Sequence, residues 1–390
     1  KAWVSVSLVG NLGLLGFFKY FDFFVDSAAD FLGLLGFRPH LPTLNVILPV
    51  GISFYTFQTL SYALDVYRGQ LAPRRSFLDF ALFVAFFPQL VAGPIVRAAD
   101  FLPQLDHPRR WSTIDVRAAL VLFLVGFFKK ACVSDGLAPA IDRYFAAPET
   151  FGALSAWIGV LCYATQIYCD FSGYSDMAIA CAALFGYHLI RNFDRPYLAS
   201  DLTDFWRRWP MSPSSWLRDY LSIPLGGNRG SRLRTYCNLM LTMLLGGLWH
   251  GAAWNFVLWG GLHGLGLAFL RALRENGVSL RIPRALGVAL TFYFVCVGWI
   301  LFRAQGLSDA GVVLRAFVLL RSPGEAALDP RILWALAALA VVHALPRTPS
   351  LTAWWRRGPG WLFAGGYALA VAVIVPFIAV NFVPFIYFQF

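Results

Sequence analysis

Apolar stretches separated by short polar breaks dominate the chain. Many of these stretches approach the ~20 residues that a helix needs to cross a bilayer. We expect helical spans in Trp3–Phe18, Leu44–Leu64, Phe77–Ile95, Ala118–Phe128, Phe151–Cys169, Tyr236–Trp249, Ala252–Leu270, Leu286–Phe302, Ile332–Leu345 and Trp361–Val383, and with less apolar character in Phe21–Phe37. Several are shorter than a full span and are predicted to be tilted, broken or re-entrant. The pattern predicts an all-α, polytopic integral membrane protein with about ten to eleven helices in one domain, 1–390.

Composition agrees with a membrane location, because 58% of the residues are hydrophobic and only 14% are charged. The net charge of +11 is spread in short basic clusters between apolar runs. That distribution is typical of the positive-inside rule and of contact with anionic membrane lipid, so we expect no nucleic-acid partner. The six cysteines include no C-x-x-C pair and are interpreted as small core residues, with no metal site.

The chain opens at Lys1 inside an apolar region, without a methionine or a recognisable signal peptide. We therefore expect the true N-terminus to lie upstream.

The longest polar interruption, Arg191–Arg234, has eight arginines and four aspartates together with several Trp and Tyr residues. Arginines among aromatic residues are typical of a segment at the membrane interface, and the excess positive charge predicts that it faces the cytoplasm. It could simply anchor the bundle to anionic lipid, or it could bind a phosphate-bearing ligand through guanidinium groups. Pro224, Gly226, Gly227 and Gly230 would turn backbone N–H groups toward such a ligand.

His250, in the string GGLWHG, is a titratable side chain between two apolar stretches. Such a residue at bilayer depth is costly unless it binds a ligand or takes part in chemistry, although it could also be merely hydrogen-bonded in the bundle. Burial among Leu245, Leu248 and Trp254 would favour the neutral imidazole, which can accept a proton. The glycines at 246, 247 and 251 would leave narrow space beside the backbone for a thin substrate arm.

Two long stretches resemble the signature of the membrane-bound O-acyltransferases, most closely the bacterial branch concerned with alginate O-acetylation. They are DFWRRWPMSPSSWLRDYLSIPLGGNR (Asp204–Arg229) and NLMLTMLLGGLWHGAAWNFVLWGGLHG (Asn238–Gly264). Further matching pieces lie in order at Leu48–Gly69, Phe86–Leu105, Gln166–Tyr187, Asn192–Trp209 and Phe385–Phe390, so the resemblance spans nearly the whole chain.

The resemblance implies a bundle of tilted helices around a central tunnel, and an extra N-terminal hydrophobic region in the relatives. It implies transfer of acetyl from acetyl-CoA, across a bacterial inner membrane, to periplasmic polysaccharide-acetylation proteins that act on an exopolysaccharide such as alginate. By the same resemblance His250 is the catalytic general base. The candidate substrate- or donor-binding residues are Arg207, Arg208, Trp209, Arg218, Asp219, Trp249, Asn255 and His263.

The chain departs from the family at RWPMS, where Pro210 stands in place of a histidine in the bacterial RWH-x-S string. Proline offers no polar side chain. Either His250 works alone, or Ser212 or Asp204 substitutes, or activity has been lost. Ser212 and Ser214 are more simply interpreted as helix-capping residues.

Two further polar features sit in apolar runs. His263 follows His250 by thirteen residues, about 20 Å along a continuous helix, and is interpreted as a neighbour of the site or as tunnel lining. Asp170 and Asp176 could suggest a proton relay, but hydrogen bonding to Ser172, Ser175 or an arginine is the favoured interpretation.

Two other functions stay open at this point. A polytopic transporter or flippase would also show many spans, but no coupling carboxylates in corresponding halves are evident. A catalytically silent scaffold is the second alternative, and Pro210 is the residue that favours it.

Overall fold

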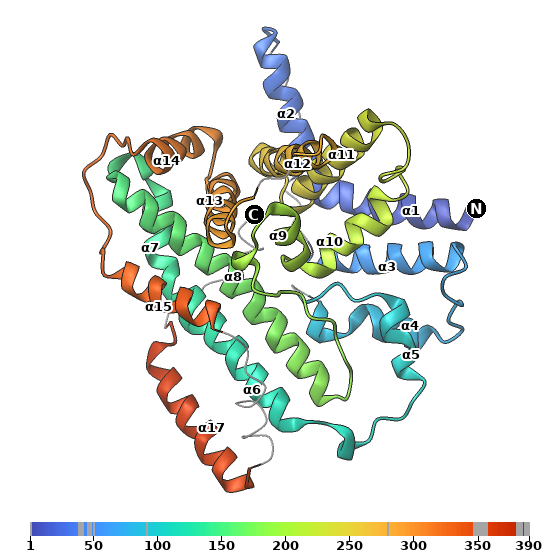
Figure 1. The fold of residues 1–390 in the computed structure, drawn as a ribbon. Helices are drawn as coiled ribbons and strands as arrows, with labels where there is room; N and C mark the ends of the chain where they lie inside the picture. Colours follow the sequence, from blue (N-terminus) through green and yellow to red (C-terminus); the bar gives the residue numbers. More distant parts are fainter. Residues whose placement is uncertain are drawn as a thin grey trace.

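The computed structural model describes residues 2–37, 43–44, 49, 51–90, 93–278, 281–345, 358–379 and 385. Within these residues the chain is built from helices joined by turns, with one isolated bridge between Phe151 and Ala326 (Figure 1). The helices are α1 (Ala2–Leu15), α2 (Phe21–Leu34), α3 (Ile52–Tyr67), α4 (Phe77–Ala85), α5 (Ala98–Leu105), α6 (Val116–Phe127), α7 (Asp135–Ala146), α8 (Ala153–Leu184), α9 (Leu202–Arg208), α10 (Met211–Leu217), α11 (Arg232–His250), α12 (Trp254–Glu275), α13 (Arg284–Arg303), α14 (Leu307–Leu319), α15 (Ile332–Ala344) and α17 (Gly360–Ile374).

A helix is found in each predicted apolar segment, which confirms the all-α membrane class. Among the described residues, four helical stretches are long and apolar enough to cross a bilayer, namely Ala2–Leu34, Trp254–Glu275, Arg284–Arg303 and Gly360–Phe377. Two shorter apolar helices occupy Phe77–Gln89 and Ile332–Ala344. Parts of the predicted segments Leu44–Leu64, Trp361–Val383 and Phe385–Phe390 lie outside the described residues.

The two N-terminal segments form a single bent run rather than separate spans. α1 passes into a π-helical turn, Gly16–Tyr20, which leads directly into α2. α1 lies beside α3, whereas α2 projects away from the rest of the molecule (Figure 1). The bend therefore brings Gly16–Tyr20 against the body of the protein.

The longest helix, α8, spans 32 residues and forms the centre of the bundle. It packs against α6, α7, α13, α14 and α15. Its crossing with α6 is close because Gly126 and Gly173 face each other, and a Cβ added to either would meet the other's carbonyl oxygen at 2.6 or 2.7 Å. Small residues let helix backbones approach in this way when lipid offers no hydrophobic driving force between helices.

α11 and α12 form a tight antiparallel hairpin around the short turn Gly251–Ala253. Gly247 faces the carbonyl of Phe256, and Gly260 faces that of Met243, so side chains at either position would push the two helices apart. The reversal places the residue at the end of α11 next to the first turns of α12.

All six cysteines are free thiols. Cys162, Cys169 and Cys296 are buried, as expected for core residues, while Cys237 is exposed.

Candidate active site

His250 is the last residue of α11, and its ring enters a pocket at the centre of the bundle. The side chains around this pocket pack closely and leave little free space between its walls. Segments far apart in sequence supply those walls, which are formed by Phe54, Gly93, Ile167, Phe171, Asn192, Phe193, Trp209, Pro210, Pro213, Trp249, His250, Trp259, Trp299 and Phe302. The lining is mainly aromatic, and its polar side chains are His250, Asn192 and the indole groups.

Three aromatic rings surround the imidazole of His250. Its centroid lies 5.0 Å from those of Trp249 and Trp259 and 5.3 Å from that of Phe302, all in edge-to-face orientation. These neighbours differ from those expected, because Leu245 and Trp254 are exposed at 39% and 54%. The apolar surroundings of His250 are supplied instead by Trp249 of α11, Trp259 of α12 and Phe302 of α13.

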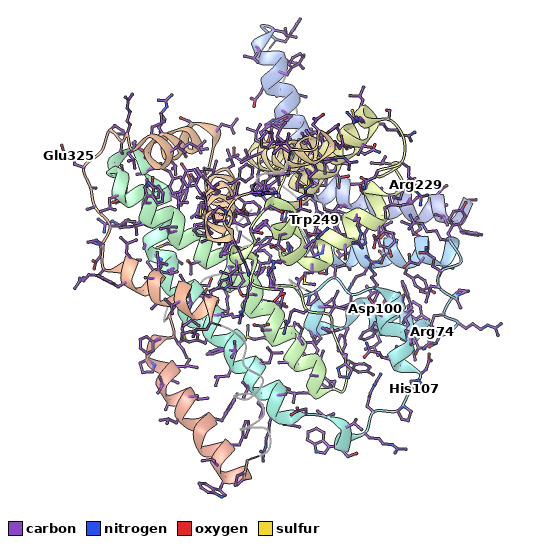
Figure 2. The ribbon with its side chains drawn as sticks, in the orientation of Figure 1. Arg74, Asp100, His107, Arg229, Trp249 and Glu325 are labelled. Atoms are coloured by element: carbon purple, nitrogen blue, oxygen red, sulfur yellow. The ribbon has the colours of Figure 1, made fainter. Side chains whose placement is uncertain are left out.

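Trp249 is held by a stack of rings from three helices. Phe57 of α3 lies between Trp249, at 5.1 Å, and Trp216 of α10, at 3.8 Å, with nearly parallel planes. The Trp216 indole also donates a hydrogen bond to the Phe57 carbonyl at 3.0 Å. Figure 2 shows Trp249 in the middle of the molecule. The stack fixes the last turn of α11 from one side.

Lys19 and Tyr20, in the π-helical turn, hold the same end of α11 from the other side. Lys19 Nζ lies 2.5 Å from the Trp249 carbonyl oxygen and 3.4 Å from that of His250. The Tyr20 hydroxyl donates to the Leu248 carbonyl at 3.1 Å. Carbonyls at a helix C-terminus have no partner within the helix and carry partial negative charge, so a lysine is well suited to them. The sequence reasoning missed Lys19, although a lone lysine within an apolar run is a usable signal.

The glycines around His250 serve helix packing rather than substrate space. A Cβ on Gly247 would meet the Phe256 carbonyl, one on Gly251 would meet the Phe256 ring, and one on Gly246 would lie 3.2 Å from Leu217. The expectation that they leave room for a substrate arm was therefore wrong.

Pro210 lines the same pocket as His250, which makes its departure from the family string relevant to the site. Ser212 and Asp204 were the residues considered as substitutes for a polar side chain at position 210, and neither is among the residues that line the pocket. Ser212 accepts a hydrogen bond from the Ile95 amide at 2.9 Å and donates to Asn192 Oδ1 at 2.9 Å. Asp204 binds Arg208 at 2.7 Å.

Asn192 is the polar residue of the pocket that sequence reasoning overlooked. Its Oδ1 accepts hydrogen bonds from both the amide and the hydroxyl of Ser212, and its Nδ2 lies 3.5 Å from Ser175 Oγ. The predicted capping roles are not found, because Ser214 donates to the Trp209 carbonyl at 3.3 Å and Ser212 is engaged by Asn192. No spacing signal in the string NFDRPY distinguishes this asparagine.

His263 lies much closer to His250 than thirteen residues of continuous helix would allow. Both imidazoles contact the Trp259 ring, with centroid separations of 4.9 Å for His263 and 5.0 Å for His250. The hairpin turn explains the difference from the expected ~20 Å. His263 is fully buried, and its Nδ1 accepts a hydrogen bond from the Trp206 indole at 3.3 Å.

The remaining candidates divide into two groups. Trp209 and Trp249 line the pocket with His250. Asn255 instead ties α12 to the end of α13 through a 2.8 Å hydrogen bond to the Ala304 carbonyl. Arg207 is exposed, and Arg208 is partly covered in its ion pair with Asp204.

Arg218 and Asp219 belong to a separate charged cluster that also contains Arg68 and Arg97. Asp219 accepts hydrogen bonds from Arg218 at 2.7 Å and from Arg97 at 2.5 Å. Arg68 and Arg97 lie 5.3 and 5.5 Å from the Tyr220 ring centroid. Burial alone raises the pKa of Asp219, but the bonds from Arg218 and Arg97 outweigh it and hold that pKa below its ordinary value. Arg68 and Arg97 precede the basic segment and were missed.

The glycine turns of the basic segment close on themselves. The amide of Gly227 donates to the Ser222 carbonyl at 2.8 Å, and that of Gly226 donates to the Ile223 carbonyl at 3.0 Å. The expectation that these N–H groups point toward a ligand was wrong for these two residues.

Residues 70–307 match the model of the membrane-bound O-acyltransferase family. The chain belongs to this family. It is 48% identical over 312 residues to a probable alginate O-acetylase of Azotobacter vinelandii, covering 80% of this chain and 61% of the relative. It is 47% identical over 312 residues to the probable alginate O-acetylase of Pseudomonas aeruginosa, with 80% and 59% covered. It is 39% identical over 346 residues to a peptidoglycan O-acetyltransferase of Helicobacter pylori, with 82% and 65% covered. The chain thus spans about three fifths of these curated relatives.

The matched range of the O-acyltransferase model contains the pocket walls from Gly93 to Phe302. Phe54 and Lys19 precede it. The N-terminal turn that holds the end of α11 therefore lies outside the matched range.

The acidic pair of α8 in this family member is neutralised by lysines. Asp170 pairs with Lys130 at 2.7 Å, and Asp176 with Lys129 at 2.6 Å. Both lysines lie in the π-helical segment Phe128–Ser134, and Lys130 also binds Asp135. The expected structural role is supported, but the partners are lysines rather than serines or an arginine. Within the described residues there is no group of three or more His, Cys, Asp or Glu able to hold a metal ion.

Proposed function

We propose that this protein is an O-acetyltransferase in which His250 is the general base. The observation that carries the proposal is the position of the His250 imidazole at a helix end, inside a narrow aromatic pocket and with that helix end held from two sides. A neutral imidazole in apolar surroundings can accept a hydroxyl proton as the new bond forms.

Acetyl-CoA is the proposed donor, and the cluster of Arg68, Arg97 and Arg218 is the proposed site for its phosphates. Guanidinium groups pair with phosphate in bidentate fashion. The Tyr220 hydroxyl, beside the cluster, donates a hydrogen bond to Asp65 of α3. Asp65 follows Phe57 of the ring stack by eight residues, so α3 connects the cluster to the stack. Eight residues of helix span about 12 Å, which is the separation that a thioester arm would bridge along α3.

The transfer then follows from the geometry of the pocket. His250 accepts the proton of the acceptor hydroxyl while its oxygen attacks the thioester carbonyl carbon. The C–O bond forms, the C–S bond breaks, and the imidazolium returns the proton to the leaving thiolate. Asn192 orients the acceptor, since Pro210 cannot, and Trp209 and Trp249 shape the pocket. His263 contacts the Trp259 ring and supports the position of that ring beside His250.

The proposed acceptors are periplasmic polysaccharide-acetylation proteins acting on an exopolysaccharide such as alginate. The similarity to alginate O-acetylases and to a peptidoglycan O-acetyltransferase supports an envelope polysaccharide. The protein would form a single membrane domain over 1–390 in the inner membrane, with 191–234 facing the cytoplasm.

Acetyl transfer from labelled acetyl-CoA in membranes that contain the protein tests this function. His250→Ala should lower the rate by about 10²–10⁴-fold, because it removes the base. His188→Ala is the matched control, since that side chain is exposed and only its backbone groups are bonded to Gln104. Full transfer by a folded His250→Ala protein would contradict the proposal.

Pro210 favours one alternative, a silent scaffold that binds donor without transferring acetyl. A scaffold would bind acetyl-CoA equally well with and without the His250→Ala substitution. The wild-type protein would transfer no acetyl even in the presence of its partners. Measuring binding and transfer on the same membranes separates the two functions.

A further inference from the structure

A second cavity lies between α15 and α17 on one side and α6, α8 and α13 on the other. Its volume is about 1520 Å³, which exceeds the ~300–1,000 Å³ that is usual for small-molecule sites. Among the described residues, it shares no lining side chain with the pocket of His250. Most of its lining is aliphatic, with members such as Val121, Leu161, Val288, Leu336, Leu362 and Val373.

α17 stands beside α6 without packing closely on the bundle (Figure 1). Hydrogen bonds join the two segments, from Arg117 to the Gly358 carbonyl at 2.6 Å and from Tyr367 to a carbonyl of α6 at 3.4 Å. Gly365 and Gly366 line the cavity, and a Cβ added to either would meet no atom within 4 Å. Glycines in membrane helices usually allow close helix packing. Open space beside these two indicates that the cavity holds something other than a neighbouring helix.

The charge of the cavity lining is one-sided. Its described residues include the cations Arg195 and Lys129 and neither aspartate nor glutamate. Lys129 is already paired with Asp176 at 2.6 Å. The Arg195 guanidinium has neither an ion pair nor a hydrogen bond within the described part of the chain. A cation beside an apolar cavity is costly without a counter-charge, so this arrangement calls for an anion.

The backbone of Arg195 is also unusual. Its φ of 49° and ψ of 58° lie in the left-handed region, which is unfavourable for an arginine. Such conformations persist where the surrounding structure enforces them, often at ligand-binding sites. Here the residue begins the turn Pro196–Leu198, which packs on α13 and contributes Tyr197 and Leu198 to the same cavity lining.

The position of α13 places Arg195 near a membrane surface. α13 is long and apolar enough to cross a bilayer, and it begins at Arg284. Ala285, in its first turn, lines the cavity. A Cβ added to Gly287 would lie 2.8 Å from the carbonyl oxygen of Ser200, five residues after Arg195. Because a spanning helix begins at the membrane surface, this end of the cavity lies at the level of the lipid headgroups.

We propose that this cavity binds one anionic phospholipid, with its phosphate on Arg195 and its acyl chains between α6, α15 and α17. Guanidinium groups pair with phosphate in bidentate fashion, and basic pockets between membrane helices bind anionic headgroups. A long aliphatic lining with an uncompensated cation at one end is complementary to a molecule with apolar chains and one charged end. The proposal goes beyond the acetyl-transfer function and does not depend on it.

Native mass spectrometry of the purified protein in detergent measures the bound lipid. The probes are phosphatidylglycerol and phosphatidylcholine with the same acyl chains, and glycerol 3-phosphate, which carries the phosphate without the chains. We expect one phosphatidylglycerol per protein, bound about tenfold more tightly than phosphatidylcholine, because only its net negative headgroup complements the arginine. Glycerol 3-phosphate should not bind at the same concentrations.

Arg195→Asn tests the headgroup contact. Asparagine tolerates the left-handed conformation, so the substitution removes the charge and keeps the turn. It should weaken phosphatidylglycerol binding about tenfold and leave phosphatidylcholine binding unchanged. Arg229→Asn is the matched control, because Arg229 is an exposed arginine of the same basic segment and is not among the residues that line the cavity.

Gly366→Trp tests the place of the acyl chains. The indole would enter the open space beside α17, so it should exclude both lipids while the protein stays folded. Gly13→Trp is the matched control, since a Cβ at Gly13 also meets no atom within 4 Å and no described residue of α1 lines the cavity. Thermal unfolding in detergent shows whether each variant is folded, and Gly366→Leu replaces Gly366→Trp if the larger side chain prevents folding.

Four outcomes would overturn the lipid site. The first is equal affinity for the two lipids, or phosphatidylglycerol binding that folded Arg195→Asn protein retains in full. The second is binding that a folded Gly366 variant leaves intact, which would place the lipid outside the cavity. The third is glycerol 3-phosphate binding as tight as that of phosphatidylglycerol, which would indicate a phosphate site without chains. The fourth is a protein dimer that Gly366→Trp abolishes, which would identify a second copy as the occupant. None of these measurements uses acetyl transfer, so each leaves the proposed function to its own test.

Discussion

Lys19 Nζ lies 2.5 Å from the backbone carbonyl oxygen of Trp249, the residue before the candidate base. The two residues are 230 positions apart in the chain. The contact exists because the N-terminal run bends at Gly16–Tyr20 and places a lysine against the C-terminal carbonyls of α11. A charged group in an apolar region is thereby paired with the negative end of a helix.

Lys19 should position His250 for transfer. Lys19→Met is expected to lower kcat by about tenfold or more, because a hydrogen bond from a charged donor contributes ~1.5–3 kcal/mol and the end of α11 would loosen. Lys19→Arg keeps the charge and should recover much of the rate. Steady-state kinetics with acetyl-CoA check this, and a Lys19→Met protein with wild-type kcat would show that the contact has no role in positioning.

The apolar pattern predicted the helices well because a bilayer demands long apolar helices whatever their neighbours. His250 could be singled out in the same way, since it is a titratable group in an apolar setting, and its role as the base stays a prediction. Asn192 and Lys19 were missed because their roles depend on chain segments that only the folded bundle brings together. The distance to His263 was wrong for a related reason: the short turn Gly251–Ala253 reverses the helix, and the periodicity of the flanking residues does not reveal it.

The α11–α12 hairpin should tolerate no side chain at Gly247. A Cβ there would meet the Phe256 carbonyl, which is backbone and cannot rotate away. We expect Gly247→Ala to destabilise the protein by about 1–3 kcal/mol through overpacking. Gly261→Ala in the same hairpin should be nearly neutral, and unfolding in detergent compares the two. Equal stability of the two variants would argue against close helix contact at Gly247.

The ion pairs of Asp219 should make stability depend on pH. Arg218 and Arg97 lower its folded pKa, so its contribution is fully present above its ordinary pKa of 3.8 and is lost as the pH falls through the lowered value. Asp219→Asn should therefore be less stable than wild type at neutral pH, and the difference should shrink below about pH 4. Unfolding midpoints across that range measure it. A constant difference would mean that the carboxylate charge is not the cause.

The arginines of the same cluster should control donor binding. Arg97→Gln and Arg68→Gln are expected to raise the KM for acetyl-CoA several-fold with little change in kcat, and added salt should weaken wild-type binding more than that of the variants. Arg229→Gln provides a control, because Arg229 is exposed at the edge of the molecule (Figure 2). Equal effects of the three substitutions would argue against a specific phosphate site.

Pro210 allows a direct test of whether a polar side chain at this position contributes to transfer. Its side chain lines the pocket beside His250, so a histidine at that position would face the reacting groups. Pro210→His should raise the transfer rate if an added polar group orients the acceptor. Both substitutions free φ at position 210 and remove the restriction that proline places on the backbone of Trp209, so Pro210→Ala loosens the chain in the same way. Pro210→Ala adds no imidazole and is therefore the control. Asn192→Ala should lower the rate in the wild-type protein and lower it less in Pro210→His, where the histidine takes over. Equal rates for Pro210→His and Pro210→Ala would show that position 210 has no polar role here and that His250 acts with Asn192 alone.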